Sequence, residues 1–308
     1  MKNNSRRILA SALFSLFLGW IMLNISAASF KKENESFQEK EMAWRENQDN
    51  RMRSQTSWLN VAGLFWLVEG ENSFGTNPLN KIKLPQGSAS LSAGKFIFYK
   101  GKVTVVANQG VELKVQDKPI TQKILKGDDS GRPDIIALND LRMWVIKRGD
   151  QYAIRLRDLN ALAYKNYKGL DFFPPSKKYK IIADFVPYPD PKKVTLDTII
   201  GTETEMTSPG YVKFFIDGQE YSLEAFSGGS KSLFFIFKDE TNGKETYEAS
   251  RFMVSDVLDN GKVDLNFNRA YNPPCAYTPY ATCLLPPPQN YLKVRIEAGE
   301  KKYPGSHH

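Results

Sequence analysis

The sequence predicts a mainly β protein in which a signal peptide and one helix precede two β-rich units. From Trp58 onward, short runs alternate apolar and polar residues, and Gly, Asn and Asp residues separate them, as in strands joined by turns. Few helical patterns interrupt these runs, which favours sandwiches or barrels over alternating strands and helices. We expect a β-sandwich-like unit over residues 55–165 and a meandering β-barrel or half-barrel over residues 177–303. A linker of residues 166–176 joins the two units, and residues 304–308 form a tail.

The N-terminus has the layout of a secretory signal peptide. Basic Lys2, Arg6 and Arg7 precede an apolar run of 18 residues, and small residues follow it up to Ala28. We expect residues 1–28 to be removed near Ala28 and the mature protein to be periplasmic or secreted. An uncleaved N-terminal membrane anchor is the alternative, because the apolar run is long enough to span a bilayer. After cleavage, no stable membrane insertion is expected.

Residues 29–54 are expected to form an N-terminal helical segment. The stretch 35–54 contains no Gly or Pro and is rich in good helix formers, which favours an α-helix. Its candidate packing residues are Phe37, Met42, Trp44 and Met52.

Alternating runs mark the strands of both units. The first unit contains "KFIFYKGKVTVVA" and "MWVIKRGDQYAIRLRD", and the second contains "YVKFFIDGQEYSLEAFSG" and "GKVDLNFN". The pairs Asp217-Gly218 and Asn242-Gly243 predict two hairpins, because Asp-Gly and Asn-Gly adopt the backbone angles of tight β-turns.

The composition excludes several classes of function. The chain has 42 Lys and Arg against 34 Asp and Glu, a net charge of +8, and removal of the three basic residues of the signal segment leaves +5. These charges are dispersed, so we expect no nucleic-acid partner, which would require a clustered basic stripe. The sole histidines are His307 and His308. A Ser-His-Asp triad and a histidine-bound zinc are therefore excluded from the interior, and we expect no metal and no cofactor.

A proline-rich strap of residues 272–290 is the most unusual segment. The stretch "NRAYNPPCAYTPYATCLLPPPQNYLKV" (268–294) holds six prolines, four tyrosines and both cysteines of the chain. Proline fixes φ and removes a backbone donor, so these segments are extended and rigid. Such a strap either closes the end of a barrel or forms one wall of a pocket.

Both cysteines of the chain, Cys275 and Cys283, lie in this strap. In an oxidising compartment we expect them to form a structural disulfide that closes a short loop. Free buried thiols are one alternative. A reactive pair is the other, although the C-x-x-C spacing is absent.

Three stretches resemble a bacterial and archaeal family known only as a domain of unknown function, number 1684. They are "SWLNVAGLFWLVEGENSFGTNPLNKIKLP" (57–85), "AIRLRDLNA" (153–161) and "VDLNFNRAYNPPCAYTPYATCLLPPPQNYLKVRIEAGEKKY" (263–303). The resemblance extends from Trp44 to Tyr303, and "NPPCAYTPYATC" is its most specific part. It implies a shared fold and no particular reaction.

Residues 64–120 also resemble, more weakly, forkhead-associated phosphopeptide-binding sandwiches. Those domains place an arginine beside the glycine of the first loop and a Ser-Arg-x-x-His segment in the next. Here the loops read Phe-Gly-Thr-Asn (74–77) and Ser-Ala-Gly-Lys (92–95). The resemblance therefore implies a sandwich topology without phosphothreonine binding.

Polar residues at strand positions define the candidate ligand site. "AIRLRD", "FKDETNGKETYEASRF" and "DLNFNRAYNPPC" are expected to converge beneath the strap, because polar groups buried on strands require partners. Separate surface patches, or a solvated strand face, are the alternative. The candidate ligand-binding residues are Arg155, Arg157, Asp158, Arg251, Asn266, Asn268, Tyr277 and Tyr280.

Two classes of function remain open from the sequence. One is a cell-envelope binding or scaffold module, which recognises a small anionic or carbohydrate-like ligand through arginines and amides. The other is a histidine-free hydrolase that relies on carboxylates, for which the candidates are Asp239, Asp264 and Glu300. The lack of interior histidines favours the binding module. Its partner is then a small molecule or an envelope component.

Overall fold

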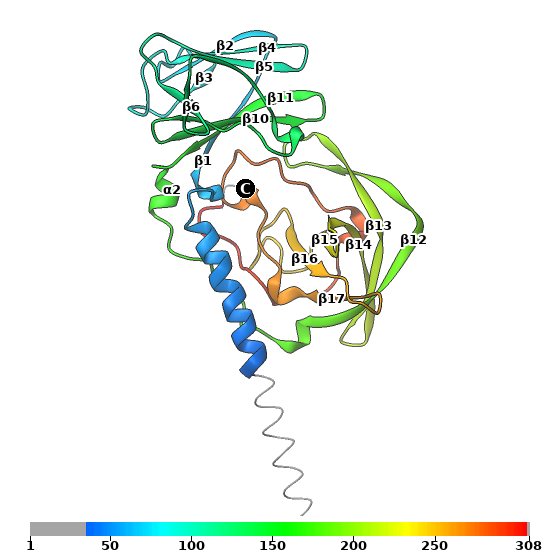
Figure 1. Cartoon of the computed structure of the whole chain (residues 1–308). Coiled ribbons are helices and arrows are strands. Elements are labelled where there is room, and N and C mark those ends of the chain that lie inside the picture. The colour runs from blue at the N-terminus through cyan, green and yellow to red at the C-terminus, as the bar shows by residue number, and fades with distance from the viewer. Residues whose placement is uncertain (1–34, 307–308) are drawn as a thin grey trace, which may run out of the picture. The chain divides into compact units, whose positions relative to one another are not determined.

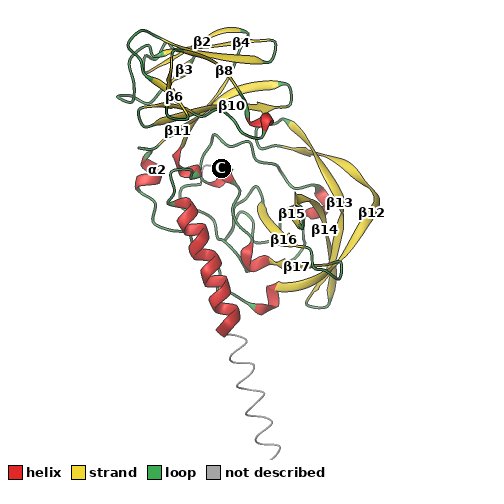
Figure 2. Cartoon of the chain, in the orientation of Figure 1, coloured by secondary structure: helices red, strands yellow, loops and turns green. Residues whose placement is uncertain are grey.

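The computed structural model describes residues 35–306, so the predicted signal peptide lies outside the described residues. Within these residues the protein is mainly β, as predicted (Figure 2). The chain divides into two compact units, one up to Asn47 and one from Gln48 onward.

A helix spans residues 35–52 and ends close to where the sequence predicts. Its last turn is held by an ion pair between Asp49 and Arg53, with 2.7 Å between Oδ2 and Nε. A second, short helix, α2 (Leu162–Lys165), was not predicted. No helix within residues 35–306 has the length and apolar character needed to cross a bilayer.

Two sheets packed face to face form the predicted β-sandwich (Figure 1). Their inner faces share one apolar core, in which the rings of Phe74 and Phe96 lie 5.0 Å apart. One sheet has the order β1 (Val61–Trp66), β11 (Gln151–Asp158), β10 (Leu141–Arg148), β9 (Ile136–Leu138), β6 (Leu113–Val115) and β7 (Lys118–Ile120). The other has the order β3 (Ile82–Lys83), β2 (Gly70–Gly75), β4 (Gly94–Tyr99), β5 (Lys102–Ala107) and β8 (Gln122–Leu125).

A third sheet curves into the predicted half-barrel. An isolated bridge between Val257 and Val263 joins its two edges, so the sheet is nearly closed. Phe214, Phe237 and Phe267 pack inside it, with Phe267 5.6 Å and 5.5 Å from the other two rings. The strand order is β16 (Arg251–Asp256), β15 (Ser232–Phe237), β14 (Gln219–Gly229), β13 (Glu203–Ile216), β12 (Lys180–Asp197) and β17 (Lys262–Asn266).

Of the two predicted hairpins, one forms as expected. Asp217 and Gly218 both have positive φ, 51° and 80°, in the two-residue turn between β13 and β14, which is the geometry of a type I′ turn. The prediction for Asn242-Gly243 was wrong. β15 and β16 do pair as antiparallel neighbours, but a loop of residues 238–250 joins them. In this loop the side chain of Asn242 accepts a hydrogen bond from the Asp239 N–H instead of forming a tight turn.

The strap runs without regular strands and is held by hydrogen bonds to several elements. It contains two 3-10 turns, η5 (Pro274–Ala276) and η6 (Pro288–Asn290). Asn290 is fully buried and bonds the backbone of Glu224 and Ile236. At its other end, Thr278 donates its hydroxyl to the Val61 carbonyl of β1 at 2.9 Å. The strap therefore contacts both the sandwich and the half-barrel.

Candidate functional site

Strand β11 places two arginines on the face of its sheet that points away from the sandwich core. Ile154 and Leu156 belong to that core, so Arg155 and Arg157 lie on the opposite face, as strand alternation requires. Asp158 ends the strand, and its carboxylate accepts a hydrogen bond from the Asn160 N–H at 2.8 Å.

Arg155 is buried without a carboxylate partner. The residue is only 4% exposed, and its guanidinium lies 5.4 Å from the ring centre of Trp58. Nη2 donates a long hydrogen bond of 3.4 Å to the Tyr280 carbonyl, and Nε has no hydrogen-bond partner among the described residues. Burial, reinforced by the neighbouring charge of Arg148, lowers the pKa of Arg155 to about 10. The protein thus holds a cation in a desolvated position.

Arg155 lines a cavity of about 290 Å³, which we name the arginine pocket. Arg148 also lines it; its Nη1 pairs with Asp128 at 2.7 Å and its Nε donates to the Thr282 hydroxyl at 3.2 Å. The charge of Arg148 is therefore balanced, whereas that of Arg155 is not. The other residues that line the pocket are Trp58, Thr204, Phe252, Pro274, Ala281, Thr282, Cys283 and Leu284.

Arg157 lies two residues further along β11 and does not line the arginine pocket. Its guanidinium is 5.0 Å from the ring centre of Trp144, and Nη2 donates to the Thr56 carbonyl at 2.9 Å. Burial lowers the pKa of Arg157 as well.

Glu300 occupies a second buried position, beneath the start of the strap. Oε1 accepts hydrogen bonds from the Tyr277 hydroxyl and from Asn272 Nδ2, the latter at 2.8 Å, and Oε2 accepts one from the Asn272 N–H at 3.1 Å. Burial raises the pKa of Glu300 to about 7, although these donors act in the opposite direction. The carboxyl group therefore changes charge near neutral pH.

Glu300 lines a cavity of about 420 Å³, which we name the glutamate pocket. Arg51, which is exposed, supplies a cation to its wall, and Tyr271 supplies an aromatic ring. Trp58 and Pro274 line both this cavity and the arginine pocket, so the two cavities adjoin.

Asp239 and Arg251 form a buried ion pair inside the half-barrel. Nη1 of Arg251 lies 2.6 Å from Oδ2 of Asp239, and both residues are almost fully buried. Nη1 and Nη2 also donate to the carbonyls of Ile296 and Ala298. Arg251, in β16, thus binds the backbone of residues 296–298, which follow the strap.

The acid and amide residues of β17 do not line either pocket with Arg155. Val263 and Leu265 point into the half-barrel core, so Asp264 lies on the opposite face, where it pairs with Lys180. A 3-10 turn, η4 (Phe267–Arg269), then ends the strand alternation.

Because of this turn, Asn266 and Asn268 are buried against each other and against the linker. Asn268 Nδ2 donates to the Ser176 carbonyl at 2.9 Å, and Asn268 Oδ1 accepts from the Ser176 N–H at 2.8 Å. These two hydrogen bonds hold the end of the linker, at Ser176, against Asn268.

The structure thus brings together only part of the predicted set. Arg155 meets the Tyr280 carbonyl, and Tyr277 meets Glu300. Neither of the two pockets is lined by Asp239, Arg251, Asp264, Asn266 or Asn268.

Sequence reasoning missed several residues that line the pockets. Three of them lie outside strands, where no alternation marks a functional side chain, and Arg148 is the last residue of β10. They are Arg51, Trp58, Arg148 and Asn272.

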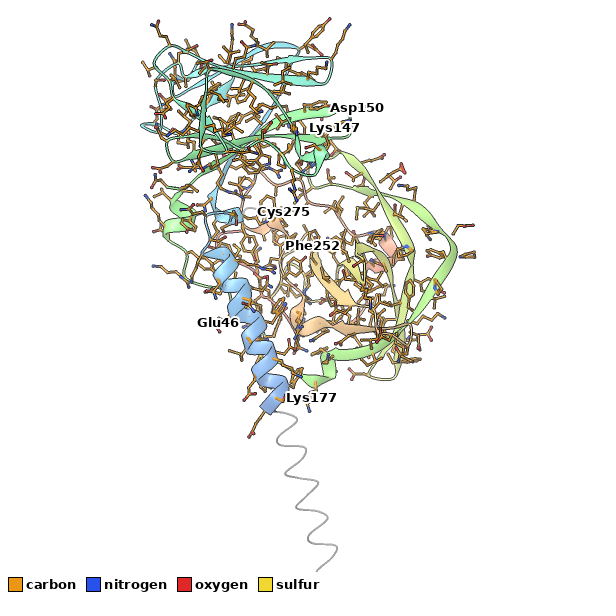
Figure 3. All side chains as sticks on the ribbon, in the orientation of Figure 1. Glu46, Lys147, Asp150, Lys177, Phe252 and Cys275 are labelled. Carbon is orange, nitrogen blue, oxygen red and sulfur yellow. The ribbon has the colours of Figure 1, made fainter. Side chains whose placement is uncertain are left out.

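The structure does not contain the disulfide that the sequence predicts. Cys275 and Cys283 are free and buried in an apolar cluster that also includes Phe252 (Figure 3). Cys275 belongs to η5, and its N–H donates to Cys283 Sγ at 3.1 Å. The Cys283 sulfur therefore serves as a hydrogen-bond acceptor for the turn. Within residues 35–306, no group of three or more His, Cys, Asp or Glu is placed to bind a metal ion.

A β-sandwich and a half-barrel, with two pockets lined in part by a proline-rich strap, define the protein as a mainly β protein with small-molecule-sized cavities. Residues 165–301 match the family described as "Protein of unknown function (DUF1684)". This match covers the half-barrel and the strap, and it confirms the resemblance for these residues. No curated protein matches the chain.

Similar solved structures include an uncharacterised protein of Haloarcula marismortui determined by solution NMR. It is 29% identical, with a TM-score of 0.37, and the match covers 44% of this chain and 78% of that one. The FHA-2 domain of a Mycobacterium tuberculosis ABC transporter is 17% identical, with a TM-score of 0.23, covering 29% and 77%. An FHA domain described for phosphothreonine-dependent interactions is 16% identical, with a TM-score of 0.22, covering 30% and 92%. The forkhead-associated likeness is thus a weak one, as the sequence indicates.

Proposed function

We propose that the protein is a binding module that takes a small oxyanion, a carboxylate or a phosphate group, in the arginine pocket. The observation that carries this proposal is Arg155, a buried guanidinium without a carboxylate partner. The neighbouring Arg148 is paired with Asp128, whereas Arg155 has no such ion pair among the described residues and is open to a ligand.

The energetics of burial support an external anion. A charge removed from water costs several kcal/mol unless it is paired and hydrogen-bonded. Arg155 recovers little of this, since it makes one long hydrogen bond and one contact with the ring of Trp58. Arginine offers a planar set of N–H donors that matches carboxylate and phosphate oxygens. A bound oxyanion would satisfy those donors and neutralise the charge.

The positions of the acids favour binding over hydrolysis. Asp239 is engaged by Arg251, and Asp264 by Lys180. Among the three carboxylates considered for catalysis, Glu300 alone lines one of the two pockets. A pair of facing carboxyl groups, which glycosidase-type chemistry uses, is therefore not formed by these residues.

The test measures the binding of inorganic phosphate and of succinate by calorimetry and by thermal unfolding. We expect one or both to bind wild-type protein and to raise its melting temperature, and we expect Arg155→Met to lose this effect. Arg132→Met is the matched control, because Arg132 is exposed and lies outside the pocket. Equal responses in Arg155→Met and wild type would contradict the proposal. The two anions distinguish a phosphate from a carboxylate ligand.

We also propose that the protein works outside the cytoplasm, in the periplasm or the medium. The basic, apolar and small-residue order of residues 1–28 supports this proposal. N-terminal sequencing of protein from a periplasmic fraction should begin near residue 29. An intact Met1 in membrane-bound material would instead favour the anchored alternative.

A further inference from the structure

The two pockets have complementary linings. The arginine pocket presents cationic donors, whereas the glutamate pocket combines a carboxyl group, an amide, hydroxyl groups and aromatic rings. Trp58 and Pro274 belong to both linings, so a ligand group bound in one cavity is adjacent to the other. Their volumes, about 290 and 420 Å³, are of the size that small-molecule sites have.

The lining of the glutamate pocket provides both donors and acceptors to an uncharged polar group. Glu300 Oε2 accepts only one hydrogen bond, from Asn272. Asn272 Oδ1 is buried and has no hydrogen-bond partner among the described residues. The hydroxyls of Ser54 and Thr56 bond to each other at 3.0 Å and lie in the same wall. An unpaired buried acceptor costs about 1–3 kcal/mol, which a ligand hydroxyl would recover once the Asn272 amide turned towards the cavity.

Three aromatic side chains give this pocket an apolar surface. Trp58 and Tyr271, which are partly exposed, and the buried Tyr277 line it. A sugar ring matches such a surface, because its C–H face packs against an aromatic ring while its hydroxyls form hydrogen bonds at the edge. An apolar ligand would leave the Asn272 acceptor unpaired. An amine would meet the cation of Arg51 in the wall.

We propose that the ligand is an anionic saccharide, with its oxyanion at Arg155 and its sugar ring in the glutamate pocket beside Trp58. This inference rests on the proposed function, and it names the class of ligand for the same site. The oxyanion supplies the charge that Arg155 lacks, and the hydroxyls supply partners for Asn272 and Glu300. Because both groups belong to one molecule, the second contact forms at a high effective concentration.

The test compares four probes on the full mature chain: inorganic phosphate, glucose, glucose 6-phosphate and glucuronic acid. We expect at least one of the two anionic sugars to bind about tenfold or more tightly than phosphate or glucose alone. Glu300→Gln and Arg51→Met should remove most of this advantage. Arg155→Met should abolish binding of phosphate and weaken that of the anionic sugars. Arg132→Met, outside both pockets, is the control.

The outcomes separate this inference from the proposed function. If phosphate binds at Arg155 but neither anionic sugar binds more tightly, the proposed function stands and the saccharide inference is overturned. If Arg155→Met changes the binding of neither phosphate nor any of the sugars, both the proposed function and the saccharide inference fail. Should Glu300→Gln not fold, Arg51→Met decides alone, because Arg51 is exposed and its substitution does not disturb the core.

Discussion

Within residues 35–306, two arginines are almost fully buried, and they have opposite surroundings. Arg251, 1% exposed, lies in the half-barrel, where it pairs with Asp239 and donates to two backbone carbonyls. Arg155, 4% exposed, lies on the outer face of the sandwich, where it has an aromatic neighbour and one long hydrogen bond. The protein has therefore paired one buried charge directly with a carboxylate and left the other without an ion pair among the described residues.

The difference shows how a structural arginine is distinguished from a ligand-binding one. A buried cation that belongs to the fold has its carboxylate and its acceptors within the chain. A buried cation that faces a cavity without them decreases the stability of the ligand-free protein, and a ligand can offset this cost. Burial alone does not separate the two, since both side chains are equally removed from water.

The largest effect on stability is expected from breaking the ion pair between Asp239 and Arg251. Asp239→Asn leaves the Arg251 charge buried and uncompensated, so the free energy of unfolding should decrease by about 3–5 kcal/mol. Urea denaturation measures it. The double variant Asp239→Asn with Arg251→Met should recover part of the loss, because it removes the unpaired charge. A single-variant loss below about 1 kcal/mol would mean that the pair does not hold the fold.

A somewhat smaller effect is expected at Glu300, the buried acid of the glutamate pocket. Its pKa is about 7 in the folded protein, against 4.5 as its ordinary value, because burial disfavours the charge. The unfolded chain loses this proton at a lower pH than the folded protein does. The contribution of Glu300 to stability is therefore fully present below pH 4.5 and is lost as the pH rises through 7. The full difference is about 3 kcal/mol. The groups near this carboxyl that also titrate or carry charge are Tyr277, Tyr167, Tyr271 and Arg251.

Glu300→Gln tests this pH dependence. The variant should remove the decrease in the free energy of unfolding between pH 4.5 and 7, since Gln does not titrate. Denaturation curves at several pH values measure the slope. Glu297→Gln is a matched control, because Glu297 is exposed. An unchanged slope in Glu300→Gln would assign the pH dependence to other groups.

The next prediction concerns the stability of a variant that lacks the Arg155 charge. Arg155→Met should leave the stability of the ligand-free protein unchanged or increase it by about 1–2 kcal/mol, because it removes an unpaired buried charge and keeps the apolar contact with Trp58. The sign is opposite to that of Asp239→Asn. Thermal unfolding in a buffer without phosphate or carboxylates measures it. A loss of several kcal/mol would show that Arg155 is a structural arginine like Arg251.

The smallest effect concerns the free thiols. Cys283 lines the arginine pocket, and burial raises its pKa, so its reactive thiolate is disfavoured. Alkylation by iodoacetamide, followed by mass spectrometry, should be slow at both cysteines in the native protein and complete in denaturant. Rapid reaction at Cys283 alone would indicate that the pocket opens. A mass two units lower, with no alkylation in denaturant, would show a disulfide after all.

The sequence predicts the fold well because it depends on local alternation. The strands of the sandwich and half-barrel, and the shared face of Arg155 and Arg157, follow from a period of two. The environment of Arg155 does not follow, since the Tyr280 carbonyl comes from 125 positions later in the chain. Likewise, alternation predicts one face for Asp264, Asn266 and Asn268. The 3-10 turn after Asn266 breaks that face and buries the two amides.

The hydrogen bond between Thr278 and Val61 joins positions 217 apart in the sequence. Contacts of such long range form late in folding, because the chain between them must first be ordered. During synthesis, the sandwich strands are complete more than a hundred residues before the strap leaves the ribosome. Both cavities therefore acquire their final wall only when the C-terminal end of the chain has been made. A nascent or C-terminally truncated chain, even one with a folded sandwich, should be unable to retain ligand.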